Sequence, residues 1–144
     1  MSRIDREGPY HRAILAQLYR RLPGAVIHHS PNEFPGKGDM IARAIAKAKK
    51  NGMVVGFPDL IVFWHGQVAL VEVKAPGGTL SDGQKAAHER FASNGFAVHV
   101  ITDPGDTEAI AAEMAAASSN WRPVGDAVRN LVEQSIAPSA EAAE

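Results

Sequence analysis

An α/β fold, with one mixed β-sheet flanked by helices, is the fold class that this sequence predicts. Segments with a helical spacing of apolar residues alternate along the chain with short segments rich in β-branched and aromatic residues. Two of these β segments are separated only by His65-Gly66, which is typical of a hairpin. The chain has 144 residues, the length of one domain with its own core. The order helix, strand, helix, strand, strand, helix, strand, helix therefore indicates a single sheet with helices packed on it.

The first two helices are expected over residues 9–22 and 39–50. Pro9 suits the first position of a helix, and a Pro-Gly pair follows the last residue of the apolar stripe. Asp39 is the expected N-cap of the second helix, whose basic residues gather at its C-terminal end, where they suit the helix dipole.

Two further helices follow in the second half of the chain. Ser81 is the expected N-cap of a helix that runs to about Ser93, and Gln84, three residues later, can complete a capping box. An alanine-rich helix is expected over residues 107–117. Four strands are expected between the helices, over residues 25–29, 57–64, 67–74 and 96–102.

The sequence predicts one domain over residues 1–123, with a basic helical insert at about 33–53. Residues 124–144 are expected to hold a short helix and a disordered tail. The absence of cysteine excludes disulfides and thiolate ligands. No apolar run approaches the roughly 18 residues of a membrane span, and the N-terminal residues do not resemble a signal peptide. We therefore expect a cytoplasmic protein with no membrane partner.

Charge is distributed unevenly along the chain. Residues 1–50 hold ten Lys and Arg against four acidic residues, a charge of +6, and the remainder holds five against twelve, a charge of −7. A basic half can bind a polyanion such as nucleic acid. It can equally be a solvated helix surface, so charge alone leaves both interpretations open.

Three ionisable residues interrupt the apolar hairpin: Asp59, Glu72 and Lys74. Glu72 and Lys74 share one face of their strand, and a hairpin that turns near residues 65–66 brings Asp59 close to them across the pair. Two converging carboxylates repel each other unless a cation lies between them, and Mg²⁺ or Mn²⁺ suits carboxylate oxygens. Such an ion supports phosphodiester hydrolysis. The alternative is an ordinary amphipathic strand with a solvated outer face.

The segments GFPDLIVF and VEVKAPGG, which carry these three residues, resemble the VRR-NUC domain of the PD-(D/E)xK nuclease superfamily. The resemblance covers roughly residues 9–115. It implies a restriction-endonuclease-like αβββαβ core, one or two divalent metal ions and structure-selective cleavage of DNA such as Holliday junctions or flaps. It also implies a homodimer in a bacterial or phage-infected cell.

Carried over to this chain, the resemblance makes Asp59 and Glu72 metal ligands, together with the backbone carbonyl of Val73. Lys74 becomes the catalytic lysine, and Gln84 becomes a site-facing residue in addition to its capping role. Many members of the family add a glutamate from the first helix, but the interior of that helix contains no acid here.

Glu7, His11 or a water molecule is then left to complete the metal shell. Histidine would favour Mn²⁺ over Mg²⁺. His88 lies one helical turn after Gln84 and could approach the site, although packing at the edge of the core is the simpler interpretation.

The basic insert supplies the candidate nucleic-acid contacts, which are Lys37, Arg43, Lys47 and Lys50. Contacts of this kind give affinity for phosphates without a choice of sequence. Two other functions remain open. The first is a nucleic-acid-binding module with the same fold and no catalysis, and the second is a nuclease that acts on RNA or on linear DNA ends.

Overall fold

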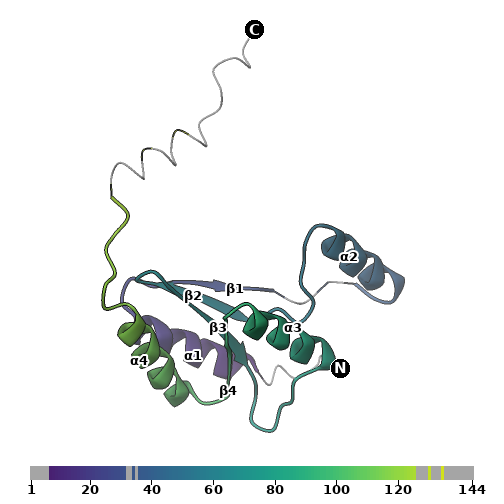
Figure 1. Ribbon diagram of the computed structural model, residues 1–144. Helices are drawn as coiled ribbons and strands as arrows, with labels where there is room; N and C mark the ends of the chain where they lie inside the picture. Colours follow the sequence, from purple (N-terminus) through teal and green to yellow (C-terminus); the bar gives the residue numbers. More distant parts are fainter. Residues whose placement is uncertain (1–6, 32–33, 35, 126–129, 131–133, 135–144) are drawn as a thin grey trace.

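A computed structural model describes residues 7–31, 34, 36–125, 130 and 134 of the chain (Figure 1). Its centre is a four-stranded sheet in the order β1-β2-β3-β4. The strands are β1 (Val26–His29), β2 (Leu60–Trp64), β3 (Gln67–Val73) and β4 (Val98–Ile101). The first three strands pair in antiparallel fashion, and β4 runs parallel to β3. The sheet is therefore mixed, as the sequence predicts.

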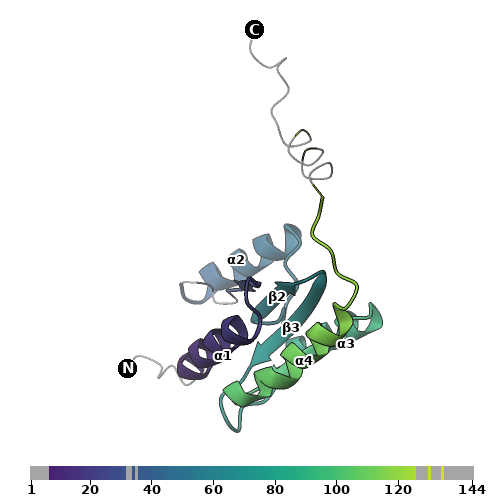
Figure 2. The same cartoon turned by 90° about the vertical axis from the view of Figure 1, so that its left-hand side faces the viewer.

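Within the described residues, four α-helices accompany the sheet: α1 (Gly8–Arg21), α2 (Asp39–Lys50), α3 (Asp82–Ser93) and α4 (Thr107–Ala117). A short 3-10 turn, η1 (Pro104–Asp106), leads into α4. Figure 2 shows α1 and α4 next to each other along the sheet. The predicted order of elements is confirmed.

The hydrophobic core lies between one face of the sheet and the pair α1 and α4. Buried side chains of these two helices pack against alternate residues of β2 and β3, among them Ile14, Leu18, Val62, Val71 and Ile110. Because successive side chains of a strand point to opposite faces, the neighbours of these residues point to the other side of the sheet. That second face is where Glu72 lies.

The hairpin register follows from its turn. His65 and Gly66 have φ values of 46° and 74°, the two positive values that a type I′ turn requires. Leu60 consequently pairs with Val71, and Trp64 pairs with Gln67. This is the register expected from the sequence, and it places the position before Leu60 opposite Glu72.

Two details of the sequence prediction are wrong. Asp39 is not the N-cap of α2 but its first residue, because the chain enters the helix through Gly38 at φ 56°, a conformation that glycine adopts at little cost. Its carboxylate still lies in the first turn, where the helix dipole favours it. Strand β2 begins at Leu60 and not at about residue 57, and Asp59, just before it, contacts β3 through its side chain.

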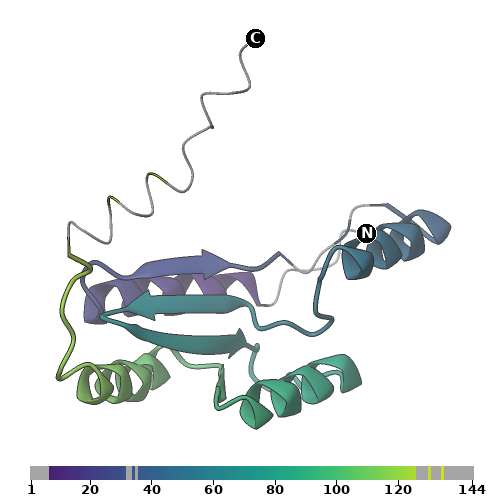
Figure 3. The ribbon, with the colours of Figure 1, turned by 45° about the horizontal axis from the view of Figure 1, so that its top comes forward.

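Helix α2 has no buried residue along its described length, Asp39–Lys50. Figure 3 shows it beyond the end of the sheet toward which β1 and β3 point. The short helix predicted within residues 124–144 lies almost entirely outside the described residues. In the described part of the chain, no helix combines the length and the apolar character of a membrane span.

Candidate active site

Asp59 and Glu72 come together where β2 begins and β3 ends. The Leu60–Val71 pairing puts Asp59 opposite Glu72 on the next step of the ladder. The Val73 backbone N–H donates a hydrogen bond of 2.8 Å to Asp59 Oδ2. This bond fixes one oxygen of Asp59 against the strand that carries Glu72.

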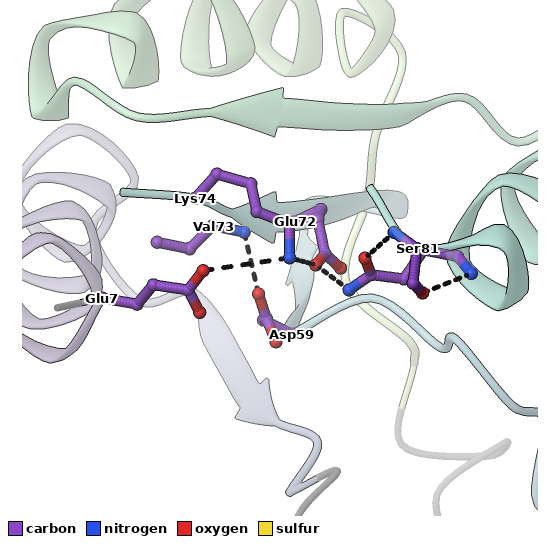
Figure 4. Close-up of polar contacts among 7 residues, drawn as sticks. Glu7, Asp59, Glu72, Val73, Lys74 and Ser81 are labelled. Atoms are coloured by element: carbon purple, nitrogen blue, oxygen red, sulfur yellow. Dashed lines mark hydrogen bonds and ion pairs between the residues drawn. The ribbon is translucent and has the colours of Figure 1, made fainter. Parts of the chain in front are cut away.

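Glu72 is fully buried, and its two oxygens have different surroundings. Lys74 Nζ lies 2.9 Å from Oε1, and the side-chain amide of Gln84 also donates to Oε1 (Figure 4). Oε2 is buried and has no hydrogen-bond partner among the described residues. The pKa of Glu72 is raised to about 7, chiefly by burial and also by the nearby charge of Asp59, against the lowering effect of the hydrogen bond and charge of Lys74. The carboxylate therefore lacks enough positive charge around it.

Lys74 is itself almost buried, with 9% of its surface exposed. Its other acidic neighbour is Glu7, whose Oε1 lies 3.9 Å from Nζ. Figure 4 shows Glu7 reaching toward the lysine from the start of α1. The lysine thus lies between a buried carboxylate from the sheet and a half-exposed one from the first helix.

Gln84 reaches Glu72 because a capping box holds its side chain. The Ser81 side chain accepts a hydrogen bond from the Gln84 backbone N–H at 3.2 Å, and the Ser81 backbone N–H donates to Gln84 Oε1 at 2.9 Å. With its oxygen engaged in this way, the amide can present only its NH₂ group to Glu72. Both roles expected for Gln84 are therefore present together.

The donor set fits a hard divalent cation. Carboxylate oxygens are the ligands that Mg²⁺ and Mn²⁺ prefer, and Glu72 Oε2 is a buried carboxylate oxygen that no described group contacts. The protein side chains supply only part of a shell: among the residues that the structure describes, no three His, Cys, Asp or Glu side chains form a cluster able to hold a metal ion. Glu7 contacts Lys74 but does not complete such a cluster.

The other predicted ligands stay predictions. Val73 contacts Asp59 through its N–H group, and its carbonyl is the atom expected at the metal. The His11 ring lies edge-on to that of His29, with ring centres 4.5 Å apart.

His88 has a buried Nε2 with no hydrogen-bond partner among the described residues, and its pKa is lowered by burial and then by the charge of Lys74. Its side chain is therefore close enough to the site to sense Lys74.

The four candidate nucleic-acid contacts, Lys37, Arg43, Lys47 and Lys50, are exposed. Three of them belong to α2, which lies at the same end of the sheet as the start of β2 and the end of β3 (Figure 3). This arrangement puts the basic residues at the carboxylate end of the sheet and away from the hairpin turn.

One structural requirement of the site was not found from the sequence. Gly56, three residues before Asp59, has φ +75°, and a Cβ atom added to it would lie 2.6 Å from the Gln84 backbone nitrogen. The segment leading to Asp59 and the start of α3 can therefore approach each other only because position 56 is glycine. The GFPD stretch contains this glycine, but the residue that requires it, Gln84, lies 28 residues away along the chain.

Comparisons with known proteins identify the fold and the family. A search of curated proteins found no match. One solved structure, described as a "VRR_NUC domain protein", is 20% identical, with a TM-score of 0.54 over 75% of this chain and 86% of the other. A second, described as a "VRR_NUC domain", is 20% identical, with a TM-score of 0.50 over 73% and 92%. At this identity both show a shared fold. Residues 13–103 match the family model of the VRR-NUC domain, so the chain belongs to the VRR-NUC family, nuclease domains of the restriction-endonuclease-like superfamily.

Proposed function

We propose that this protein is a divalent-metal-dependent DNA endonuclease that hydrolyses phosphodiester bonds, with branched DNA such as Holliday junctions or flaps as its preferred substrate. The observation that carries the proposal is the state of Glu72. A fully buried carboxylate, with one oxygen unpartnered among the described residues and a second carboxylate beside it, favours a further cation in addition to the Lys74 ammonium on its other oxygen.

Asp59 and Glu72 would hold Mg²⁺ or Mn²⁺ with the oxygens that point away from Val73 and Gln84. When bound, such an ion polarises a phosphoryl oxygen and lowers the pKa of a coordinated water. The hydrogen bonds from Val73 to Asp59 and from Gln84 to Glu72 set the orientation of both carboxylates before substrate arrives.

Lys74 would stabilise the negative charge that develops on the phosphate. Its Nζ is held 2.9 Å from Glu72 and close to Glu7, so the ammonium group is already positioned in the site before substrate binds. Such preorganisation means that little rearrangement is needed when the phosphate arrives.

The exposed lysines and arginine of the insert would bind DNA phosphates beside the site, which supplies affinity without sequence choice. A domain of this size offers little surface for a branched substrate. We therefore propose a homodimer, in which two sites act on one DNA molecule.

The test is cleavage of a labelled four-way junction and of a matched linear duplex, with Mg²⁺, Mn²⁺ or EDTA. We expect the wild type to cut in metal only, and Lys74→Ala to bind the junction without cutting it. Lys85→Ala is the matched control, because it removes the same charge from a lysine that pairs with Asp82 on the surface of α3. Cleavage that persists in Lys74→Ala would contradict the assignment of the site.

A binding module without catalysis is the second candidate, and it is favoured by the lack of a third acidic ligand among the described residues. It predicts equal junction binding with and without metal, and no cleavage by the wild type. The same assay with RNA and with blunt linear ends tests the remaining substrate classes.

A further inference from the structure

A hollow of about 320 Å³ lies on the surface between the C-terminal end of α2 and helix α3. Its apolar part is formed by Met53, Val54 and Val55, which follow α2, and by two alanines of α3, of which Ala86 is exposed at the rim. The volume is at the lower end of the range of small-molecule sites, roughly 300–1,000 Å³. The hollow is thus large enough for one small planar group.

The hollow adjoins the candidate active site. Gly83 belongs to its lining, and the next residue, Gln84, contacts Glu72. A Cβ atom on Gly83 would lie 3.2 Å from the Val55 side chain, so the glycine keeps this part of the hollow open. Along the chain, the lining of the hollow is therefore one residue away from a side chain that contacts Glu72.

The charge of the hollow suits a phosphate ester. Lys49 from α2 and Arg90 from α3 contribute to the lining, and the described lining contains no acidic residue. Both side chains are exposed, and neither forms an ion pair within the described part of the chain. An arginine can also lay its planar guanidinium on the face of a base.

We propose that this hollow binds one unpaired nucleotide of the nucleic acid next to the scissile phosphate, with the base on the apolar floor and the phosphate near Lys49 and Arg90. A paired base cannot enter, because it is stacked inside the duplex, whereas an extrahelical base can. A protein partner fits less well: eight residues line the hollow, compared with roughly 20–30 residues on each side of a stable interface.

This inference rests on the proposed function and adds a subsite to it. The experiment measures binding in EDTA, so that neither cleavage nor metal affects the result. The probes are a duplex with one central 2-aminopurine bulge and the same duplex fully paired. We expect the wild type to bind the bulged duplex about fivefold to tenfold more tightly, at the lower end of what stacking contributes per base, and the 2-aminopurine fluorescence to rise as the base leaves the helix stack.

Ala86→Trp fills the hollow from an exposed position of α3 without a change in charge. It should abolish the preference for the bulge and leave binding of the paired duplex within twofold of wild type. Ala92→Trp makes the same change at an exposed position of α3 outside the hollow, and it should behave as wild type. Arg90→Ala should weaken binding of the bulged duplex more than that of the paired one.

Equal binding of both duplexes by the wild type would overturn the inference, and so would an Ala86→Trp variant that keeps the preference. A change of oligomeric state in Ala86→Trp, with the preference intact, would assign the hollow to contacts between copies of the chain. A wild type that cuts DNA but ignores the bulge refutes the subsite alone. A wild type that neither binds nor cuts nucleic acid refutes the proposed function as well.

Discussion

Gly56→Ala tests the close packing of the segment before Asp59 against the start of α3. Gly56 has φ +75°, so an alanine there carries about 1–2 kcal/mol of backbone strain. Its Cβ would also lie 2.5 Å from the Gly83 carbonyl carbon and 2.6 Å from the Gln84 nitrogen. These are backbone atoms at the start of a capped helix and cannot move singly, and such overpacking typically costs a further 1–3 kcal/mol or so. The expected loss of stability is therefore about 2–5 kcal/mol.

Gly77→Ala is the matched control, because Gly77 has nearly the same φ, +78°, but no atom within 4 Å of the added Cβ. It should lose only the strain, about 1–2 kcal/mol. Urea denaturation of the wild type and both variants gives the difference. If the clash is instead relieved by a shift of α3, the Gln84–Glu72 bond is the contact that breaks, and DNA cleavage should then fall much more in Gly56→Ala than in Gly77→Ala.

Equal losses of stability and of cleavage in the two variants would refute this reasoning. It would mean that α3 does not rest against the segment before Asp59, and that the start of the helix does not depend on residue 56.

Three further predictions concern the ionisable residues of the site. Gln84→Glu keeps the capping box, since glutamate serves at this position, but it places a carboxylate against Glu72. We expect a melting temperature at pH 5 close to that of the wild type and DNA cleavage at least tenfold slower. If a change of pH alone restores the wild-type cleavage rate, Gln84 does not act by orienting Glu72. The pKa of Glu72 is raised to about 7 on folding, so the folded state holds this proton more tightly than the unfolded state. The free energy of unfolding in EDTA, measured by urea denaturation, should therefore fall by about 3 kcal/mol as pH rises from 4.5 to 7. Glu72→Gln should lack this decrease, and a variant with the same pH profile as the wild type would refute the burial argument. Glu7 is half exposed and 3.9 Å from Lys74, so Glu7→Gln should lower the free energy of unfolding by less than about 1 kcal/mol. The Mg²⁺ affinity measured by calorimetry should stay unchanged. A large drop in that affinity would make Glu7 a ligand.

The elements of the fold could be predicted from the sequence because each one depends on local patterns. The type I′ turn at His65-Gly66 fixes the hairpin register by itself, and that register brings Asp59 opposite Glu72. Ser81 and Gln84 are separated by the spacing of a capping box, and the box is formed. In both cases the information lies within a few residues of the position concerned.

The features that were missed depend on how distant segments pack. The contact of Gly56 with the start of α3 was not predicted, and Glu7 could be named only as one of three candidates near the site. Both contacts follow from the docking of helices on the sheet, which no local pattern contains. Asp39 was assigned to the wrong cap position because the neighbouring Gly38 could adopt the entry conformation instead. The ligand role of His11 remains a prediction, since its described contact is the ring of His29.

The burial of Glu72 argues against a solvated outer face for the VEVK strand. A solvated outer face requires an exposed glutamate and an exposed lysine, but Glu72 is 0% and Lys74 9% exposed. Replacing a buried, incompletely paired ion by an apolar residue is often neutral or stabilising, so stability alone gives no reason for a glutamate at this position. A pKa raised to about 7 means that ionised Glu72 destabilises the metal-free protein at neutral pH. The metal ion that we propose beside Asp59 and Glu72 would remove that cost, whereas an ordinary outer strand gives no reason for a glutamate buried at this position.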